Sequence, residues 1–547
     1  MKIMLGEFSE EELLGLLHDV NNTSNRIKYL VWLCIYYAFC KSKVYIKKKK
    51  ERKNVKRMVK DYIYVNNLKY QMVLRIFLLV FFINIGCAEA KPESEKPNIL
   101  FFLVDDLGWL DVGYQGSKFY ETPNIDSLSK RGMKFRSAYS SHPRCVPSRY
   151  GIMTGRYPAR TKSPGPGSQL NESEYTIAEA LSDNGYSTFI AGKWHLSRGN
   201  RGSSPEDQGF DKNYGGGDSG VPKSYFYPYN IQKRGKGNEN APDITKLPEV
   251  EEGYHITDQL TDLTLNWLGE NYIGSHNNKP FFVYLSHYEV HTPFEGKADL
   301  EKKYKSKADK IYKGHELENP FSFEKTTGET KLRQDNHIYA AMIENLDNNL
   351  GRVLKFLREN NLYDNTIIVF TSDHGGLSNR GNGRPLATSN LPLRAGKGHN
   401  YEGGIKVPLF VVWEDVIQQG WSNTVVTGTD HFPTLLELIG KNQMKDKHLD
   451  GVSFSKSLVG KFQDNSKRPI FWHSPRPRPK STGDLANTTV RLGDYKLLDF
   501  YREGRVELYN IIEDQSESKN LSEIMPDKKN ELHELVKNWR ISVDAIE

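Results

Sequence analysis

Four apolar runs along the chain are continuous, where a half-exposed strand would alternate between apolar and polar residues. Continuous runs are typical of strands buried on both faces of a mostly parallel sheet. Each run ends in polar residues, and the carboxyl ends of parallel strands meet at one edge of a sheet. The sequence therefore predicts that these polar residues gather at one edge, beyond strands at residues 98–104, 187–191, 281–285 and 366–370.

Between the runs, apolar residues recur at the three- and four-residue steps of a helix. Residues 338–357 predict one amphipathic helix, and residues 174–184 predict another that ends at Gly185. After residue 450 the pattern changes to short strand-like segments and a terminal helix near residues 527–540. We predict an α/β fold, with a large, mostly parallel mixed sheet flanked by helices and a smaller C-terminal antiparallel-sheet subdomain.

Charge is unevenly distributed along the chain. The 547 residues include 75 Lys and Arg against 68 Asp and Glu, a net charge of +7. The first 90 residues contain 16 of the basic and 8 of the acidic residues, so the remainder is close to neutral. A near-neutral remainder without a basic block argues against nucleic acid as a partner.

Residues 72–90 have the three parts of a secretory signal peptide: a basic residue, a short apolar run and a small-residue ending at Ala90. The run is too short for a stable transmembrane span. We interpret residues 1–71 as a leader, disordered or wrongly included upstream of a start at Met72; the alternative is a polybasic arm near a membrane. The sequence predicts a periplasmic or secreted protein, with lipid attachment at Cys87 as the alternative.

Cleavage after Ala90 would leave Cys145 as the one cysteine of the mature chain. A single cysteine cannot form an internal disulfide in an oxidising compartment. Cys145 begins the segment CVPSR, which resembles the C-x-P-S-R signature of the type I sulfatases, whose cysteine is oxidised after translation to Cα-formylglycine. The alternative for a lone cysteine is a small buried apolar residue.

The resemblance continues over residues 96–525, in blocks that follow the family's order: PNILFFLVDDLGW, TPNIDSL, AGKWH, the His-Thr-Pro at 291–293, TSDHG, RAGKGHNYEGGIKVP, DHFPTLLEL and ELYNIIED. It implies an alkaline-phosphatase-like fold, with a catalytic domain at residues 91–450 and an α+β subdomain at 451–547. It also implies a sulfuric ester hydrolase similar to bacterial exported polysaccharide sulfatases, matured by a formylglycine-generating or maturase enzyme.

The family's metal ligands match four residues here, and the modified Cys145 would complete the set: Asp105, Asp106, Asp373 and His374. Three carboxylates favour one hard cation, Ca²⁺ ahead of Mg²⁺. His374 stands where the family more often has Asn, and its nitrogen is a poorer calcium ligand, which leaves the identity of the metal open.

The resemblance also implies the catalytic roles. Positive charge must surround the sulfuryl oxygens, a nucleophile must attack sulfur, and the leaving oxygen must be protonated. Asp373 is a candidate base for the nucleophilic hydroxyl. The other roles fall to Arg149, which would hold the nucleophile, Lys193 and Lys397 on the sulfate oxygens, His195 on the nucleophile, and His291 as general acid.

Two loops, at residues 198–230 and 376–394, are predicted to select the substrate. Aromatic side chains can stack on sugar faces, and arginines can bind carboxylates or further sulfates. An ordinary solvated loop is the alternative for any one of their residues: Arg380 and Arg384, and then Arg198, Arg201, Arg394, Tyr225, Tyr227 and Tyr229.

Export and this rim together predict a sulfated sugar unit of a polysaccharide as the substrate, either an algal glycan such as ulvan or carrageenan, or a glycosaminoglycan. Two other functions remain open at this point. One is a phosphodiester or phosphonate monoester hydrolase of the same superfamily, which can use the same modified cysteine. The other is a non-catalytic protein that binds sulfated glycans.

Overall fold

The computed structural model describes residues 96–546, except 162–168, 198–201, 232–241, 274–278, 316, 462, 464 and 466. Residues 95–547 make up one compact unit. The predictions made for residues 1–90, including the signal peptide and Cys87, lie outside the described residues.

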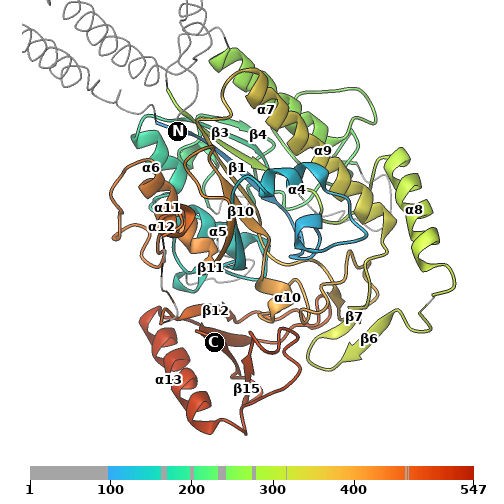
Figure 1. Cartoon of the computed structure of the whole chain (residues 1–547), viewed down its shortest axis with the longest axis vertical. Coiled ribbons are helices and arrows are strands. Elements are labelled where there is room, and N and C mark those ends of the chain that lie inside the picture. Colours follow the sequence, from blue (N-terminus) through green and yellow to red (C-terminus); the bar gives the residue numbers. More distant parts are fainter. Residues whose placement is uncertain are drawn as a thin grey trace, which may run out of the picture. The chain divides into compact units, whose positions relative to one another are not determined.

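An eight-stranded mixed sheet forms the centre of this unit, in the order β11-β2-β10-β8-β1-β5-β3-β4 (Figure 1). Neighbouring strands are parallel except where β10 pairs antiparallel with β2 and β8. The bounds are β1 (Asn98–Val104), β2 (Met133–Tyr139), β3 (Ser187–Gly192), β4 (Lys212–Tyr214), β5 (Phe281–Ser286), β8 (Thr366–Ser372), β10 (Leu409–Val412) and β11 (Gly420–Thr427).

The four predicted strands are β1, β3, β5 and β8, which are adjacent to one another in the sheet. They were recognisable because each is buried on both faces. The sequence analysis missed β11 because its exposed and buried residues are mixed, from the half-exposed Trp421 to the buried Val426. It missed β10 because that strand has only four residues.

Helices cover both faces of the central sheet (Figure 1). Alternate residues of β1 enter two separate hydrophobic cores: Leu100 and Phe102 pack on one side, and Ile99 and Phe101 on the other. The first core includes residues of α4 (Pro123–Ser129), α7 (Ile256–Tyr272), α8 (Ala298–Tyr312) and α9 (His337–Glu359). The second includes residues of α5 (Cys145–Thr154), α6 (Ile177–Asp183), α11 (His431–Leu438) and α12 (Ser455–Leu458).

Helix α6 starts later than predicted, at Ile177 instead of residue 174. Thr176 caps it, because its hydroxyl oxygen accepts a hydrogen bond from the Glu179 amide at 3.1 Å while the Glu179 carboxylate accepts one from the Thr176 amide at 2.8 Å. This reciprocal pair satisfies two amides at the helix start. Gly185, with φ +84°, follows the end of the helix, where the sequence predicted it would stop.

The C-terminal part contains the predicted antiparallel sheet, in the order β12-β13-β14-β15. Helix α13 packs on one face through Leu532 and Val536, and the other face contacts Ala395 and Tyr401 of the catalytic part. The predicted boundary at residue 450 stays a prediction. The bounds are β12 (Ile470–Ser474), β13 (Asn487–Leu492), β14 (Tyr495–Phe500), β15 (Arg505–Asn510) and α13 (Pro526–Ser542).

The remaining elements are short. A three-stranded sheet consists of β6 (Phe321–Glu324), β7 (Gly328–Lys331) and β9 (Asn379–Arg380). Single turns of helix are η1 (Gly113–Gln115), η2 (Pro158–Arg160), η3 (Glu206–Gln208), α10 (Glu402–Ile405) and η4 (Gly428–Asp430).

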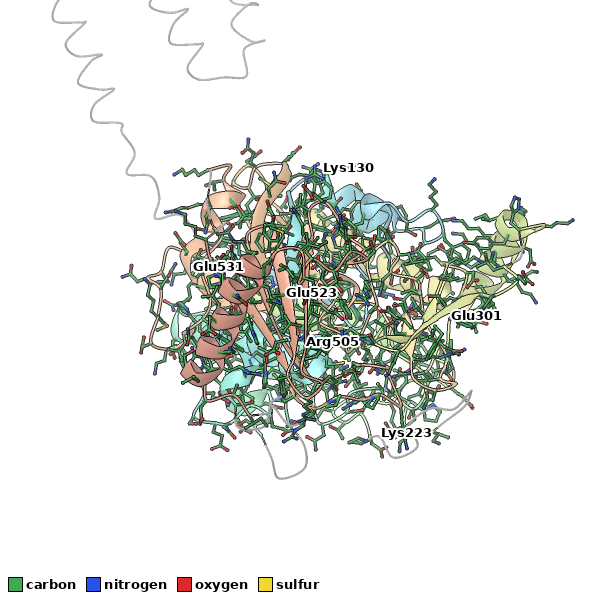
Figure 2. All side chains as sticks on the ribbon, turned by 90° about the horizontal axis from the view of Figure 1, so that it is seen from below. Lys130, Lys223, Glu301, Arg505, Glu523 and Glu531 are labelled. Carbon is green, nitrogen blue, oxygen red and sulfur yellow. The ribbon has the colours of Figure 1, made fainter. Side chains whose placement is uncertain are left out.

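Charged side chains of both signs cover the surface, including Lys130, Glu301, Arg505 and Glu523 (Figure 2). Among the described residues, no helix is both long enough and apolar enough to cross a membrane.

Candidate active site

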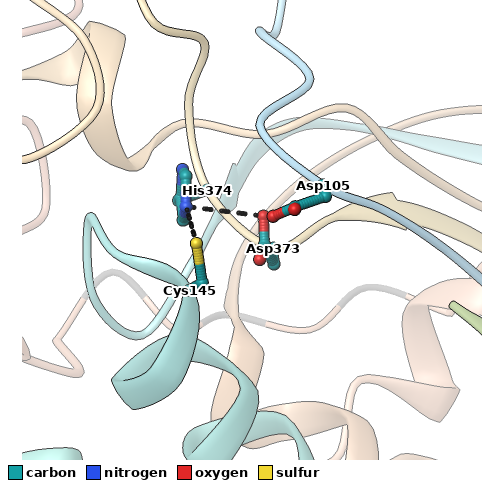
Figure 3. A group of neighbouring side chains, drawn as sticks. All are labelled: Asp105, Cys145, Asp373 and His374. Carbon is teal, nitrogen blue, oxygen red and sulfur yellow. Dashed lines mark hydrogen bonds and ion pairs between the residues drawn. The ribbon is translucent and has the colours of Figure 1, made fainter. Parts of the chain in front are cut away.

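The structure brings the polar residues that follow the central strands to one edge of the sheet. Asp105 and Asp106 follow β1, and Asp373 and His374 follow β8, which is the neighbour of β1. Lys193 and His195 follow β3, and His291 lies beyond the end of β5. Cys145 is the first residue of α5 and points at His374 and the carboxylates (Figure 3). The sequence analysis expected the acids, Lys193 and the histidines to meet here because they follow the carboxyl ends of parallel strands, and it assigned Cys145 to the same site through the family resemblance.

The Cys145 thiol is 7% exposed and lies among charged side chains. Its sulfur lies 3.2 Å from His374 Nε2, 3.7 Å from Lys397 Nζ and 3.9 Å from Asp106 Oδ1. Burial raises the pKa of this thiol, but the charges of Lys193 and Lys397 outweigh burial, and the pKa lies well below its usual value. The two lysines therefore stabilise negative charge at position 145. An incoming anion or a nucleophilic oxygen would require such stabilisation.

Three cationic side chains form hydrogen-bonded ion pairs with the three carboxylates. Lys193 Nζ donates to Asp105 Oδ2 at 2.6 Å, and Lys397 Nζ contacts both Asp106 oxygens at 2.7 Å. Arg149 Nε donates to Asp373 Oδ2 at 3.0 Å. Burying a charged group is costly unless it is paired, so these contacts explain how so many ionic groups can share one buried site.

The carboxylates differ in how easily they ionise. Burial raises the pKa of Asp105 well above its usual value, although Lys193 opposes the shift. Burial would also raise the pKa of Asp106, but His291, Lys397 and His374 lower it to about 2. Two neighbouring acids with opposite shifts are typical of a functional site.

Backbone geometry sets this site apart from the rest of the sheet edge. Asp106 has φ +63° and His195 has φ +59°, in the left-handed region that residues other than glycine rarely adopt. Such strain persists only where the surrounding structure enforces it, and it is frequent at active sites.

Two histidines lie near the cysteine. His195 is half-buried and close enough to Cys145 for a hydrogen bond to the sulfur to influence the pKa of the histidine, which desolvation lowers to about 4. His291 Nε2 lies 3.6 Å from Asp106 Oδ2, and burial lowers its pKa to about 3 despite the nearby Asp106. Its side chain is 13% exposed, and both histidines are half-buried.

Arg149 is fixed by two contacts that sequence analysis missed. Its Nη1 donates to Ser286 Oγ at 2.6 Å and to the Lys193 carbonyl oxygen at 2.9 Å, which ties α5 to the ends of β5 and β3. Ser286 is the last residue of the FFVYLS strand, and its place at the strand end was the one available signal.

The candidate substrate residues are placed unequally. Arg384 lies within electrostatic reach of Asp106 and Cys145, while Arg380 pairs with Glu329 at 2.6 Å and donates to the Arg384 carbonyl oxygen at 3.0 Å. Arg394 is held by Glu324 and lies over the Tyr401 ring, away from the thiol.

The prediction of an aromatic rim is wrong for two of its members. Tyr225 is fully buried, and its hydroxyl donates to the main-chain oxygens of Tyr288 and His291 at 2.6 and 2.9 Å. Tyr229 is also buried. Both rings pack in the hydrophobic core that includes residues of α7. Arg198 and Arg201 lie outside the described residues.

The donor set fits a divalent cation. Two overlapping groups have ligand atoms within 4.8 Å of one another: Asp105, Cys145, Asp373 and His374, and Asp105, Asp106, Cys145 and His291. Asp105 Oδ1 is buried and has no hydrogen-bond partner. A buried, unpartnered carboxylate oxygen beside two further carboxylates is suited to a hard cation.

Comparison with protein families decides the class. The family model described as Sulfatase matches residues 97–441, and the model for the N-sulphoglucosamine sulphohydrolase C-terminal region matches residues 396–541. The chain belongs to the type I sulfatase family. This sulfatase is a sulfuric ester hydrolase, and enzymes of the family generally use a metal ion and formylglycine.

Individual relatives agree with this class. A sulfatase from Formosa agariphila is 29% identical over 83% of this chain and 89% of its own length. The N-acetylgalactosamine-6-O-sulfatase of Bacteroides thetaiotaomicron is 25% identical over 82% of this sulfatase and 93% of its own length. The crystal structure of Ps i-CgsB, which has also been solved in complex with k-i-k-neocarrahexaose, superposes with a TM-score of 0.64 at 30% identity, covering 81% of this chain and 92% of that one.

Proposed function

We propose that this sulfatase removes sulfate from sulfated carbohydrate, with a formylglycine made from Cys145 as its nucleophile. The observation that carries the proposal is the position of Cys145, at the first turn of α5 and within 4 Å of Lys397, His374 and Asp106. A cysteine that served only as a small buried apolar residue would not need charged groups around its sulfur. The surrounding charge therefore argues against that alternative.

Lys193 and Lys397 are suited to hold the sulfuryl oxygens. Both are buried, and both lower the pKa of Cys145, so their charges act on the same point from different sides. Charge fixed in a site of low dielectric stabilises developing negative charge more than it would in water. Their ion pairs with Asp105 and Asp106 hold the two ammonium groups in place for this role.

The metal would be held by Asp105, Asp106, Asp373 and His374, with Ca²⁺ ahead of Mg²⁺ because the set is rich in oxygen. When bound, the cation would supply positive charge that lowers the pKa of a hydroxyl at position 145. The nitrogen of His374 leaves the choice between the two cations to experiment.

Formylglycine would supply a hydrated aldehyde, one hydroxyl of which can attack sulfur while the other allows sulfate to be expelled without water having to hydrolyse a stable ester. The modification requires a formylglycine-generating or maturase enzyme as a partner. Arg149, fixed by Asp373 and Ser286, would orient this residue from within α5.

Proton transfer falls to groups on either side of position 145. Asp373 is the candidate base, because Arg149, His374 and Lys193 keep its pKa low in spite of burial and it therefore stays ionised. His291, whose side chain is 13% exposed, would protonate the leaving alcohol. His195 would hydrogen-bond to the nucleophile.

The carbohydrate substrate is supported by the relatives. One acts on N-acetylgalactosamine 6-O-sulfate groups, and one structure holds a neocarrahexaose. Together with the signal peptide expected at residues 72–90, they favour an exported enzyme that acts on oligosaccharides of a sulfated polysaccharide, either an algal glycan or a glycosaminoglycan.

Mass spectrometry of the peptide that contains Cys145, isolated from the native source, tests the mechanism. We expect an aldehyde in place of the thiol, and an unmodified thiol in active enzyme would overturn the proposed nucleophile. Sulfate release from a panel of sulfated oligosaccharides tests the substrate class. Turnover of small aryl sulfates with no release from any oligosaccharide would refute it.

The rival hydrolase activity is separated by matched esters. We expect 4-nitrophenyl sulfate to be hydrolysed with a higher kcat/KM than 4-nitrophenyl phosphate and the corresponding phosphodiester. A preference for the phosphorus esters would favour the phosphodiester or phosphonate monoester alternative. Binding of sulfated sugars without turnover, in protein that carries formylglycine, would favour the non-catalytic alternative.

A further inference from the structure

The loop at residues 475–486, which joins β12 to β13, belongs to the C-terminal sheet but lies against the catalytic loops. A Cβ atom on Gly381 would fall 1.7 Å from the Pro479 carbonyl oxygen. A Cβ on Gly398, which has φ +97° and follows Lys397, would fall 2.7 Å from Thr482 Oγ1. Only glycine permits such close approach at both places. The C-terminal loop is therefore built into the wall of the active site.

Hydrogen bonds connect three arginines, Arg144, Arg384 and Arg478, to the C-terminal loop. Arg384 Nη1 donates to Ser481 Oγ at 3.0 Å. Asp484 Oδ2 accepts from Arg144 Nη2 at 2.6 Å and from the Arg478 amide at 3.2 Å. The three arginines come from separate segments: one precedes the nucleophile, one lies in the loop after β8, and one lies in the C-terminal loop.

Positive charge exceeds negative charge at this place. Asp484 pairs with Arg144, and within the described part of the chain no carboxylate pairs with the guanidinium of Arg384 or Arg478. Like charges held together without partners are costly, which favours an anion between them.

This excess of positive charge lies beside the proposed reacting centre. Arg144, which bonds to Asp484 of the C-terminal loop, directly precedes Cys145, and Gly398, which contacts Thr482, directly follows Lys397. The loop that carries Arg478 and binds Arg384 through Ser481 therefore lies beside the groups that would hold the scissile sulfate. Arg478 is exposed and Arg384 half-buried, so a ligand can reach both.

We propose that Arg384 and Arg478 form a second anionic subsite, which holds a carboxylate or a second sulfate of the same saccharide while the scissile sulfate lies against Lys193 and Lys397. Planar guanidinium groups bind carboxylate and sulfate oxygens in pairs. Arg144 is a positioning residue, because its bond to Asp484 fixes the loop that carries Arg478. This subsite rests on the proposed function and narrows its substrates to saccharides with at least two anionic groups.

Inhibition of 4-nitrophenyl sulfate hydrolysis by three sugars tests the subsite. The probes are N-acetylgalactosamine 6-sulfate, N-acetylgalactosamine 4,6-disulfate, and an unsaturated uronyl disaccharide that carries the same 6-sulfate. The second probe adds a sulfate and the third adds a carboxylate. Arg478→Ala is compared with wild type and with Arg476→Ala, which removes an exposed arginine from the same loop.

We expect the wild type to bind at least one doubly anionic probe about 10- to 100-fold more tightly than the monosulfate, as for a charged hydrogen-bonded pair. Arg478→Ala should lose this preference, measured as the ratio of the inhibition constants of the probes, while Arg476→Ala should keep it. Which probe gains shows whether the second anion is a sulfate or a carboxylate. Equal preference in wild type and Arg478→Ala, or no preference in wild type, would overturn the subsite.

Failure of the proposed function gives a different result. If formylglycine-bearing protein hydrolyses no sulfate ester, the proposed function fails. The subsite is then decided by calorimetric titration of Cys145→Ala with the same three sugars. Tighter binding of a doubly anionic probe that Arg478→Ala abolishes would support the subsite even then, and equal binding of all three would refute it.

Discussion

Two buried ionic clusters in this molecule compensate their charges in different ways. The first lies at the proposed active site, is called the catalytic cluster here, and consists of Asp105, Asp106, Cys145, Arg149, Asp373, Lys193 and Lys397. The structural cluster lies between α10 and the C-terminal sheet and consists of Tyr139, Glu402, Arg491, Lys496 and Glu517.

In the structural cluster the groups satisfy one another. Lys496 Nζ lies 3.0 Å from Glu402 Oε1 and 2.9 Å from Glu517 Oε1, and the Glu402 amide donates to Glu517 Oε2 at 2.7 Å. Glu517 Oε1 and Asp105 Oδ1 both lack a hydrogen bond, but Glu517 Oε1 lies 2.9 Å from Lys496 Nζ, whereas Asp105 Oδ1 lies 3.6 Å from Arg149 Nη2, its equally unbonded ion-pair partner. One cluster is closed, whereas the other leaves groups available to a ligand. Changes in the first should therefore alter stability, and changes in the second should alter chemistry.

The largest effect is expected for Cys145→Ala. It removes the precursor of the nucleophile, so kcat/KM for sulfate esters should fall by about 10⁴-fold or more, as when an essential nucleophile is deleted in other hydrolases. The melting temperature should change little, because the thiol contributes almost nothing to the hydrophobic cores. Turnover within tenfold of wild type would show that the reaction does not use this residue.

Lys496→Met should act on stability alone. It leaves Glu402 and Glu517 buried without their shared cation, and we expect the free energy of unfolding to fall by about 3–5 kcal/mol. Urea denaturation measures the change, and kcat/KM per folded molecule should be unchanged. The matched control is Lys528→Met, which removes a surface lysine paired with Glu531 and should cost about 0.5 kcal/mol or less. Equal destabilisation by both variants would contradict the closed cluster.

Lys397→Ala should act on chemistry. Its ammonium group lies 3.7 Å from the Cys145 sulfur, and losing one preorganised charge should lower kcat/KM by about 10²- to 10³-fold. The control is Lys480→Ala, an exposed lysine of the neighbouring C-terminal loop, which should retain wild-type turnover. If the two variants hydrolyse 4-nitrophenyl sulfate equally well, Lys397 does not hold the sulfuryl group.

The smallest effect concerns pH and the structural cluster. Burial raises the pKa of Glu517 from 4.5 to about 7, with Lys496 opposing the shift. Between these two values the folded chain keeps a proton that the unfolded chain has lost, so stability falls as pH rises through this window. The lowered pKa of Glu402 acts below pH 4.5, outside the window.

Unfolding of wild type and Glu517→Gln at pH 5 and pH 7 measures this contribution. Wild type should lose about 1–3 kcal/mol more than the variant between the two values. Glu503→Gln, which changes an exposed glutamate, should behave as wild type. A variant with the full wild-type slope would place the titrating group elsewhere.

Much of the fold and the site could be predicted because each rested on local sequence. Strands β1 and β8 are continuous apolar runs, and the acids that follow them had to meet at one edge once the strands were parallel. Cys145 and Arg149 stand in one short motif, one helical turn apart. The resemblance to the family supplied the roles, and Lys397, far from any apolar run, was assigned through it alone.

Other features could not be predicted because they depend on distant contacts. Tyr225 was expected at the rim, yet its ring fills the core under α7. Arg478 stands in a run of prolines and basic residues that gave no sign of its target, since the loop reaches the site only through the packing of the C-terminal sheet on Ala395 and Tyr401.

The sequence by itself determined the parallel strands, the acids at their ends and the motif that begins at Cys145, because hydrophobic period and motif spacing are local properties. Only the tertiary structure decided which charges stand unpaired. Lys193 is paired with Asp105, Lys496 with two glutamates, and Arg478 with no carboxylate among the described residues. A charged side chain stabilises the fold or remains available to a ligand according to the partners that folding places beside it. These partners come from segments hundreds of residues apart in the sequence.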